Sequence, residues 1–256
     1  MAKVMPVWNV DLRVRYVEDS NATGKVLPAG LPSPKAIAER LNVIYRQACV
    51  RFTARDPDTM TKTNVHYDSD KDGEVKNLAL ENSELSSLLD APGLCDAQMN
   101  LVLVRSLLSA NSAYEGDGKM VWGIAFRPLK PTWVGRMVMF AERFKISESE
   151  INEEQFMHTC AHEVGHDLGL GTRSNNANLV PPGLRNTVAW KPGRAQYHDI
   201  GFFPRDRWRA WSLLHTLQMQ GLMWPFVPRP DAVGESRWLR HEDWLEANKI
   251  AEQRKL

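Results

Sequence analysis

Two histidines four residues apart, His162 and His166, place the strongest constraint on how this chain can fold. On an α-helix, side chains at positions i and i+4 lie one above the other, so both imidazoles can bind one metal ion. Glu163 follows the first histidine and is positioned to deprotonate a water molecule that the metal activates. The pattern therefore predicts a helix that carries two zinc ligands and a general base. The alternative is a helix with two unrelated surface histidines.

The composition is that of an ordinary globular protein and excludes several classes of partner. The 256 residues are enough for one large domain or two small ones, and 43% of them are hydrophobic, as in ordinary globular proteins. The formal net charge of +1 gives no electrostatic basis for binding nucleic acid. No apolar run is long enough to span a membrane, and the N-terminus has no hydrophobic signal segment. We therefore expect neither a nucleic acid partner nor a membrane span.

The first two-thirds of the chain predict a strand, a helix, several strands and a second helix. Alternating apolar and polar residues from Trp8 to Val17 indicate a half-buried strand. Ser33 and Pro34 are typical of a helix N-cap and first helical residue. Further strands are expected at residues 50–53, 63–67, 97–107, 120–126 and 137–140.

The helix with the two histidines has candidate start and stop signals. Ser147 and Glu150 match a capping box at its beginning. Gly169 is expected to end it, because glycine tolerates the left-handed conformation that follows many helices. The sequence thus places the metal helix between about residues 147 and 169.

The remainder of the chain is rich in loops and ends in a helix. Residues 171–207 are punctuated by glycine and proline, and helical character returns from Arg207 to Gln220. A final helix is expected from Arg237 to Gln253, with Trp238, Leu245 and Ile250 facing inward. We therefore predict a single α+β domain over residues 1–256. Its N-terminal lobe, about 1–169, has a mixed twisted sheet and two helices, and its C-terminal lobe, about 170–256, is loop-rich.

These features together resemble the metzincin zinc metalloproteases, with details closest to the matrixins. The helix motif is His162-Glu163-x-x-His166-x-x-Gly169, and Leu222–Pro225 resembles the family's methionine turn. The order of elements fits from about residue 7 to the C-terminus. The resemblance implies a metzincin-like fold, one zinc ion, a protein or peptide substrate, and hydrolysis with Glu163 as the general base. The strand at 120–126 is then a candidate sheet edge for binding substrate as an added strand.

The sequence departs from the family at the third zinc ligand. The family's third histidine falls three residues after the glycine, where this chain has Thr172. A threonine hydroxyl is a poor zinc ligand beside imidazole, thiolate or carboxylate. The ligand is therefore displaced or missing, and the remaining candidates are His198, Asp199, Asp206 and His215.

His215 is the candidate that the resemblance favours. It stands eight residues before Met223, at about the distance that separates the third histidine of matrixins from the turn methionine. This alignment implies a long insertion after Leu170 that leaves the metal ligand beside the methionine turn. His198, within the loop, is the rival imidazole.

A short acidic segment resembles half of a calcium-binding loop. Asp68, Asp70 and Asp72 supply oxygens at alternate positions, and Gly73 stands at the sharp turn. Position twelve, which needs a bidentate glutamate, is Ala79. A Ca²⁺ site and a solvated turn between strands are both compatible with this pattern.

Two alternatives concern the function of the whole domain. A catalytically inactive, zinc-stabilised binding module is favoured by Thr172 and opposed by the intact Glu163. Metzincin-like domains without a leader also resemble toxin cargo of bacterial secretion spikes. That reading predicts an effector that acts outside the producing cell, with a carrier or immunity protein as partner.

Overall fold

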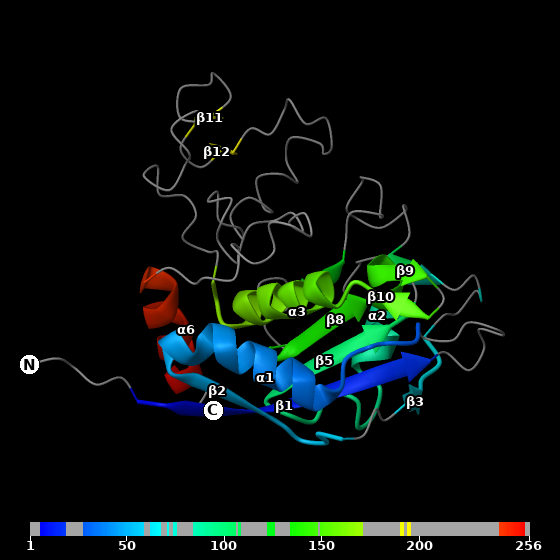
Figure 1. Cartoon of the computed structure of the whole chain (residues 1–256), viewed down its shortest axis with the longest axis horizontal. Coiled ribbons are helices and arrows are strands. Elements are labelled where there is room, and N and C mark those ends of the chain that lie inside the picture. The colour runs from blue at the N-terminus through cyan, green and yellow to red at the C-terminus, as the bar shows by residue number, and fades with distance from the viewer. Residues whose placement is uncertain are drawn as a thin grey trace, which may run out of the picture.

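A mixed, mostly parallel sheet forms the centre of the computed structural model (Figure 1). The structure describes residues 6–18, 28–58, 62–67, 71, 74–75, 84–105, 107–108, 122–125, 134–147, 149–170, 190–191, 194–195 and 241–253. The strands are β1 (Trp8–Glu18), β2 (Val50–Ala54), β3 (Lys62–Asn64), β4 (Glu74–Val75), β5 (Met99–Val104), β6 (Leu107–Leu108), β7 (Gly123–Ala125), β8 (Arg136–Phe140), β9 (Lys145–Ser147), β10 (Glu150–Ile151), β11 (Trp190–Lys191) and β12 (Arg194–Ala195). The helices are α1 (Pro34–Tyr45), α2 (Glu84–Leu89), α3 (Glu153–Asp167) and α6 (His241–Gln253), with short 3-10 turns at Arg46–Ala48 and Ala141–Phe144.

The main sheet has the strand order β2-β1-β5-β8-β7, and β3 also pairs with β1. All of its pairs are parallel except β7 with β8, so the sheet ends in an antiparallel edge strand. Helices α1 and α3 lie along one face of this sheet (Figure 1). The α+β class expected from the sequence, with a mixed sheet and few helices, is confirmed.

Alternation along the strands creates a separate core on each face of the sheet. In β5, Leu101 and Leu103 belong to the larger core beneath α1 and α3. Val102 and Val104 point the opposite way, into a smaller core that includes α2. The alternating strand predicted from Trp8 is confirmed as β1. The strands predicted at 50–53, 97–107, 120–126 and 137–140 correspond to β2, β5, β7 and β8, and the one at 63–67 matches β3 only in its first half.

Helix α1 begins as the sequence predicts. Ser33 is the N-cap, and its hydroxyl accepts a hydrogen bond from the backbone N–H of Ala36 at 3.2 Å. Proline at the first helical position loses no hydrogen bond there. The buried face of the helix consists of Pro34, Ile37, Ala38, Leu41, Ile44 and Tyr45.

Both helices expected in the N-terminal lobe are present as α1 and α3, and the structure adds a short third one, α2. It has only six residues, which is too short for a helical period to stand out in the sequence. Leu85, Leu88 and Leu89 nevertheless follow the i, i+3, i+4 spacing, and all three are buried in the smaller core. The second face of the sheet is therefore partly covered by a helix.

The final helix is confirmed as α6, and Ile250 is buried as predicted, but the inward orientation predicted for Leu245 is wrong. Leu245 is 49% exposed, whereas Ala247, Ile250 and Ala251 are buried. The amide of Asn248 fixes this orientation by donating to the carbonyls of Pro6 at 3.0 Å and Ala48 at 2.9 Å. Within the described segments, no helix combines the length and apolarity that a membrane crossing requires.

Between α3 and α6, the described residues form only the β11–β12 hairpin. The expected helix at 207–220, the methionine turn at 222–225 and Trp238 lie outside the described residues. The division into an N-terminal and a loop-rich C-terminal lobe therefore stays a prediction.

Candidate metal centre

Helix α3 carries the two histidines and Glu163, as the sequence predicts, but it begins later than expected. Its N-cap is Asn152, whose side chain accepts a hydrogen bond from the N–H of Gln155 at 3.1 Å. The capping box assigned to Ser147 and Glu150 was wrong. Those residues lie in the antiparallel pair of β9 and β10, where an extended backbone prevents either from starting a helix.

The C-terminal end of α3 is closed at Gly169, which confirms the predicted stop. Gly169 has a φ of +79°, and its N–H donates to the carbonyl of His166 at 3.0 Å. The N–H of Leu170 donates to the carbonyl of Gly165 at 2.8 Å. This pair of bonds is a Schellman motif, which satisfies carbonyls at the helix end and fixes the turn in which His166 lies.

The imidazoles of His162 and His166 lie together on one face of α3. Their ring centroids are 4.6 Å apart, with an angle of 89° between the ring planes. Both side chains are buried, as is every residue of the helix from Phe156 to Asp167. The alternative hypothesis of two surface histidines is therefore wrong. A buried pair at this spacing can converge on one ion.

Glu163 is buried in the same turn, where its charge is poorly solvated. Burial raises the pKa of its carboxyl to about 8, while a hydrogen bond from the backbone of Ala125 acts in the opposite direction. Glutamate is rarely buried to this degree unless it is paired or functional. The hydrogen bond comes from the edge strand β7, so α3 and β7 together hold the carboxyl group.

Two further contacts, not anticipated from the sequence, hold α3 in place around these side chains. The hydroxyl of Tyr45 in α1 donates to the carbonyl of Ala161 at 2.6 Å, one residue before His162. Asp167 is completely buried and accepts a hydrogen bond from the N–H of Gly135 at 2.9 Å. Both contacts join residues far apart in the chain, so no local sequence pattern predicts them.

The chemistry of these donors fits a zinc ion, and two of the predicted ligands are brought together. Two buried imidazoles at helical spacing, beside a carboxyl that can exchange a proton, match the donor preference of zinc. Across the described part of the chain, no group of three His, Cys, Asp or Glu side chains is arranged to hold a metal. Thr172 and the candidates for the third ligand, His198, Asp199, Asp206 and His215, lie outside the described residues, as do Asp68, Asp70 and Asp72 of the possible calcium loop.

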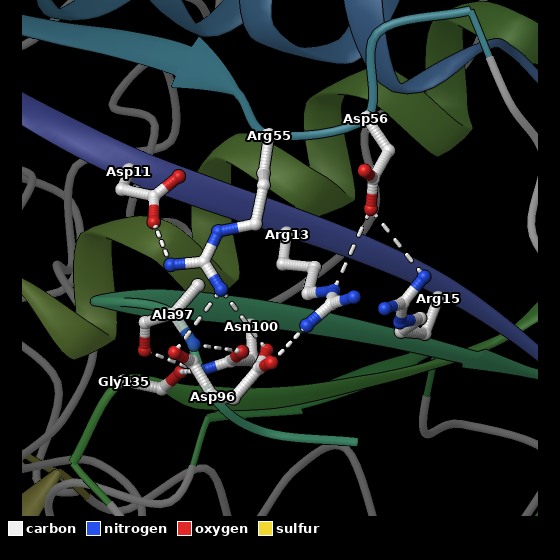
Figure 2. Close-up of polar contacts among 9 residues, drawn as sticks. All are labelled: Asp11, Arg13, Arg15, Arg55, Asp56, Asp96, Ala97, Asn100 and Gly135. Atoms are coloured by element: carbon white, nitrogen blue, oxygen red, sulfur yellow. Dashed lines mark hydrogen bonds and ion pairs between the residues drawn. The ribbon is translucent and has the colours of Figure 1, made fainter. Parts of the chain in front are cut away.

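A second polar cluster lies on the face of β1 that points away from α1. Its members on β1 alternate with the apolar residues that face α1, and the cluster contains equal numbers of arginines and aspartates (Figure 2). We call it the arginine–aspartate ladder, and its members are Asp11, Arg13, Arg15, Arg55, Asp56 and Asp96.

Each charge of the ladder has a neighbour of opposite sign. Arg13 forms an ion pair with Asp96, and its Nε lies 3.6 Å from Oδ2 of Asp56. The same oxygen of Asp56 lies 3.4 Å from Nη1 of Arg15. A hydrogen bond from Arg13 holds the pKa of Asp96 below its usual value. The ladder is thus internally neutralised, and we assign it no catalytic role.

Comparisons with known proteins found a similarity among solved structures but none by sequence. No protein-family model and no curated protein matches the chain. Among solved structures, the chain is similar to archaemetzincin from Methanopyrus kandleri, with 15% sequence identity, a TM-score of 0.47 and 96% of each chain covered.

Proposed function

We propose that the chain is a zinc-dependent endopeptidase in which Glu163 is the general base. One observation carries the proposal: a buried carboxyl with a pKa raised to about 8 stands in the same helical turn as two buried imidazoles whose ring centroids lie 4.6 Å apart. Burying titratable side chains such as His162, Glu163 and His166 costs stability, and strongly shifted pKa values are enriched at functional sites.

The proposed ligands are His162 and His166 from α3, with His215 as the third, as the resemblance to matrixins implies. His198 is the alternative third ligand. When bound, zinc would polarise the scissile carbonyl and make a water molecule more acidic. The protein's contribution is to hold both imidazoles on one rigid helix, closed at its C-terminal end by the turn at Gly169.

Glu163 would move the proton. Its carboxylate would accept a proton from the attacking water and deliver it to the leaving nitrogen as the carbon–nitrogen bond breaks. Burial raises the proton affinity of the carboxyl group, and the backbone of Ala125 restrains the group without neutralising it. The side chain can therefore be both basic and fixed in position.

Strand β7 is the proposed edge for binding an extended peptide. It is the last strand in the order of the main sheet, and it packs directly against α3. An added strand would form backbone hydrogen bonds with such an edge and pass close to Glu163. This arrangement favours a protein or peptide as the substrate class.

Metal analysis and hydrolysis of a peptide library together test the proposal. We expect about one zinc per chain, loss of zinc in His166→Ala, and loss of hydrolysis with retention of zinc in Glu163→Gln. His158→Gln is the matched control, because His158 is also a buried histidine of α3 but is not a proposed ligand. Stoichiometric zinc without any hydrolysis would favour the inactive binding module instead. Less than about 0.3 zinc per chain after addition of zinc would refute the site.

A further inference from the structure

Strand β7 approaches Glu163 at a position that has no side chain. A Cβ atom placed on Gly123 would lie 2.8 Å from Cγ of Glu163, 3.0 Å from its Oε1, and 2.8 Å from Sδ of Met139. Cβ atoms essentially never come within 3.0 Å of another heavy atom in this way. Even one methyl group at residue 123 would therefore displace the side chains around it.

Backbone conformation does not account for glycine at this position. Gly123 is absent from the glycines with positive φ, so an L-amino acid can adopt its conformation. Replacing such a glycine by alanine normally stabilises a protein, because the unfolded chain loses conformational freedom. What excludes a side chain here is the space taken by Glu163 and Met139.

The strand register shows how this close approach is built. Gly123 is paired with Met139 of β8, and Ala125 is paired with Met137. Residues 123 and 125 share one face of β7, which is the face toward α3. The missing side chain at Gly123 and the hydrogen bond from Ala125 therefore act on the same carboxyl group.

We propose that Gly123 is a positioning residue that seats the general base. Without a Cβ at residue 123, the backbone of β7 lies directly against Glu163 and limits the positions of its carboxyl group. The catalytic consequence rests on the function proposed above, whereas the contact between Gly123 and Glu163 does not.

A double-mutant cycle in urea tests the contact without using activity. We expect Gly123→Ala to lower the unfolding midpoint of the metal-free protein by about 1 M, because the added methyl group would overpack the buried side chains of Glu163 and Met139. In the Glu163→Ala background the same change should lower it by much less, because the shortened side chain leaves room. If Gly123→Ala alone does not fold, recovery of folding in the double variant supports the proposal. Equal losses in both backgrounds, or no recovery, would overturn it.

A second glycine provides the matched control. Gly93 has a φ of +73° and nothing within 4 Å of a Cβ placed on it, so Gly93→Ala adds backbone strain without a steric clash. We expect its effect on the midpoint to be the same with and without Glu163. A coupling as large as that of Gly123 would show that the cycle reports general destabilisation, and the proposal would fall.

Kinetics of the zinc-loaded protein test the consequence for catalysis. At a temperature where both variants are folded, Gly123→Ala should lower kcat about 100-fold with less than about threefold change in KM and unchanged zinc content. Gly93→Ala should keep the wild-type kcat. A wild-type kcat in Gly123→Ala would overturn the positioning role. If the wild-type protein hydrolyses no peptide, the proposed function fails, and the urea cycle alone decides whether Gly123 seats Glu163.

Discussion

The polar side chains of α3 and those of the arginine–aspartate ladder lie on opposite faces of the same sheet and are stabilised in different ways. In the ladder, a hydrogen bond from Arg13 lowers the pKa of Asp96, because the charged form is paired. In α3, burial raises the pKa of Glu163 to about 8, because the charged form is desolvated. One environment stabilises a carboxylate, and the other makes it a stronger base.

The difference indicates which cluster supports chemistry. A paired and partly exposed carboxylate has little tendency to accept a proton, whereas a buried one at neutral pH can both accept and release it. The stability of the fold does not require an ionisable group at Glu163. In the ladder, by contrast, each charged side chain is paired with one of opposite sign on the outer face of β1. The predictions below test this contrast between the two faces.

The largest expected effect concerns activity. Glu163→Gln keeps the size of the side chain but removes the base, so kcat/KM should fall by about 10²- to 10⁴-fold. Asp96→Asn makes the same chemical change in the ladder and should alter kcat/KM by less than about twofold. Steady-state kinetics on any cleaved peptide provide the measurement. Comparable losses in the two variants would remove the functional distinction between the faces.

The second prediction concerns pH and the metal-free protein. The carboxyl of Glu163 has a pKa of about 8 in the folded state, against 4.5 for an ordinary glutamate, so the folded state binds the proton more tightly between these values. Stability should therefore fall as pH rises from about 4.5 to about 8, by a few kcal/mol in total. Urea unfolding at several pH values should show a shallower fall in Glu163→Gln. A parallel pH dependence in wild type and variant would contradict the assignment of Glu163 as the buried titrating group.

The third prediction concerns the end of α3. Asp167 is fully buried and bonded to the N–H of Gly135, so Asp167→Ala should leave that donor unsatisfied and lower the free energy of unfolding by about 2–3 kcal/mol. Asp167→Asn retains an acceptor oxygen and should cost less. Urea denaturation measures both changes. An alanine variant as stable as wild type would show that the turn at Gly135 does not depend on this contact.

The parts of the fold that the sequence predicts well are those specified by local rules. Ser33 followed by proline marks the start of α1, and Gly169 marks the end of α3, because capping depends on a few neighbouring residues. The i, i+4 spacing of His162 and His166 likewise determines that both rings share a helix face. These features need no knowledge of distant contacts.

The incorrect predictions depend on contacts between distant segments. Ser147 and Glu150 match a capping box, but pairing of β9 with β10 holds them in an extended conformation. Leu245 fits an inward stripe of α6, but the hydrogen bonds of Asn248 to Pro6 and Ala48 orient the helix otherwise. Tertiary structure overrides a local pattern in both cases.

The candidate site also combines features that follow local sequence rules with features that depend on distant contacts. Glu163 could be identified from the sequence, whereas Gly123 could not, although a glycine inside an apolar strand is a known sign of close backbone approach. The third zinc ligand, the Ca²⁺ loop, the partner proteins and the site of action stay predictions. The first two depend on residues outside the described part of the chain, among them His198, His215 and Asp68.

The smallest expected effect concerns the ladder itself. The side chain of Asp96 is 42% exposed, so water competes with its ion pairs to Arg13 and Arg55. Asp96→Asn should therefore lower the free energy of unfolding by less than about 1 kcal/mol, and 1 M salt should reduce the difference further. The effect of Asp167→Asn, a fully buried position, should depend much less on salt. Urea unfolding at low and high ionic strength measures both. A loss at Asp96 that is large and insensitive to salt would mean that the ladder is part of the buried structure, and the contrast between the two faces would no longer hold.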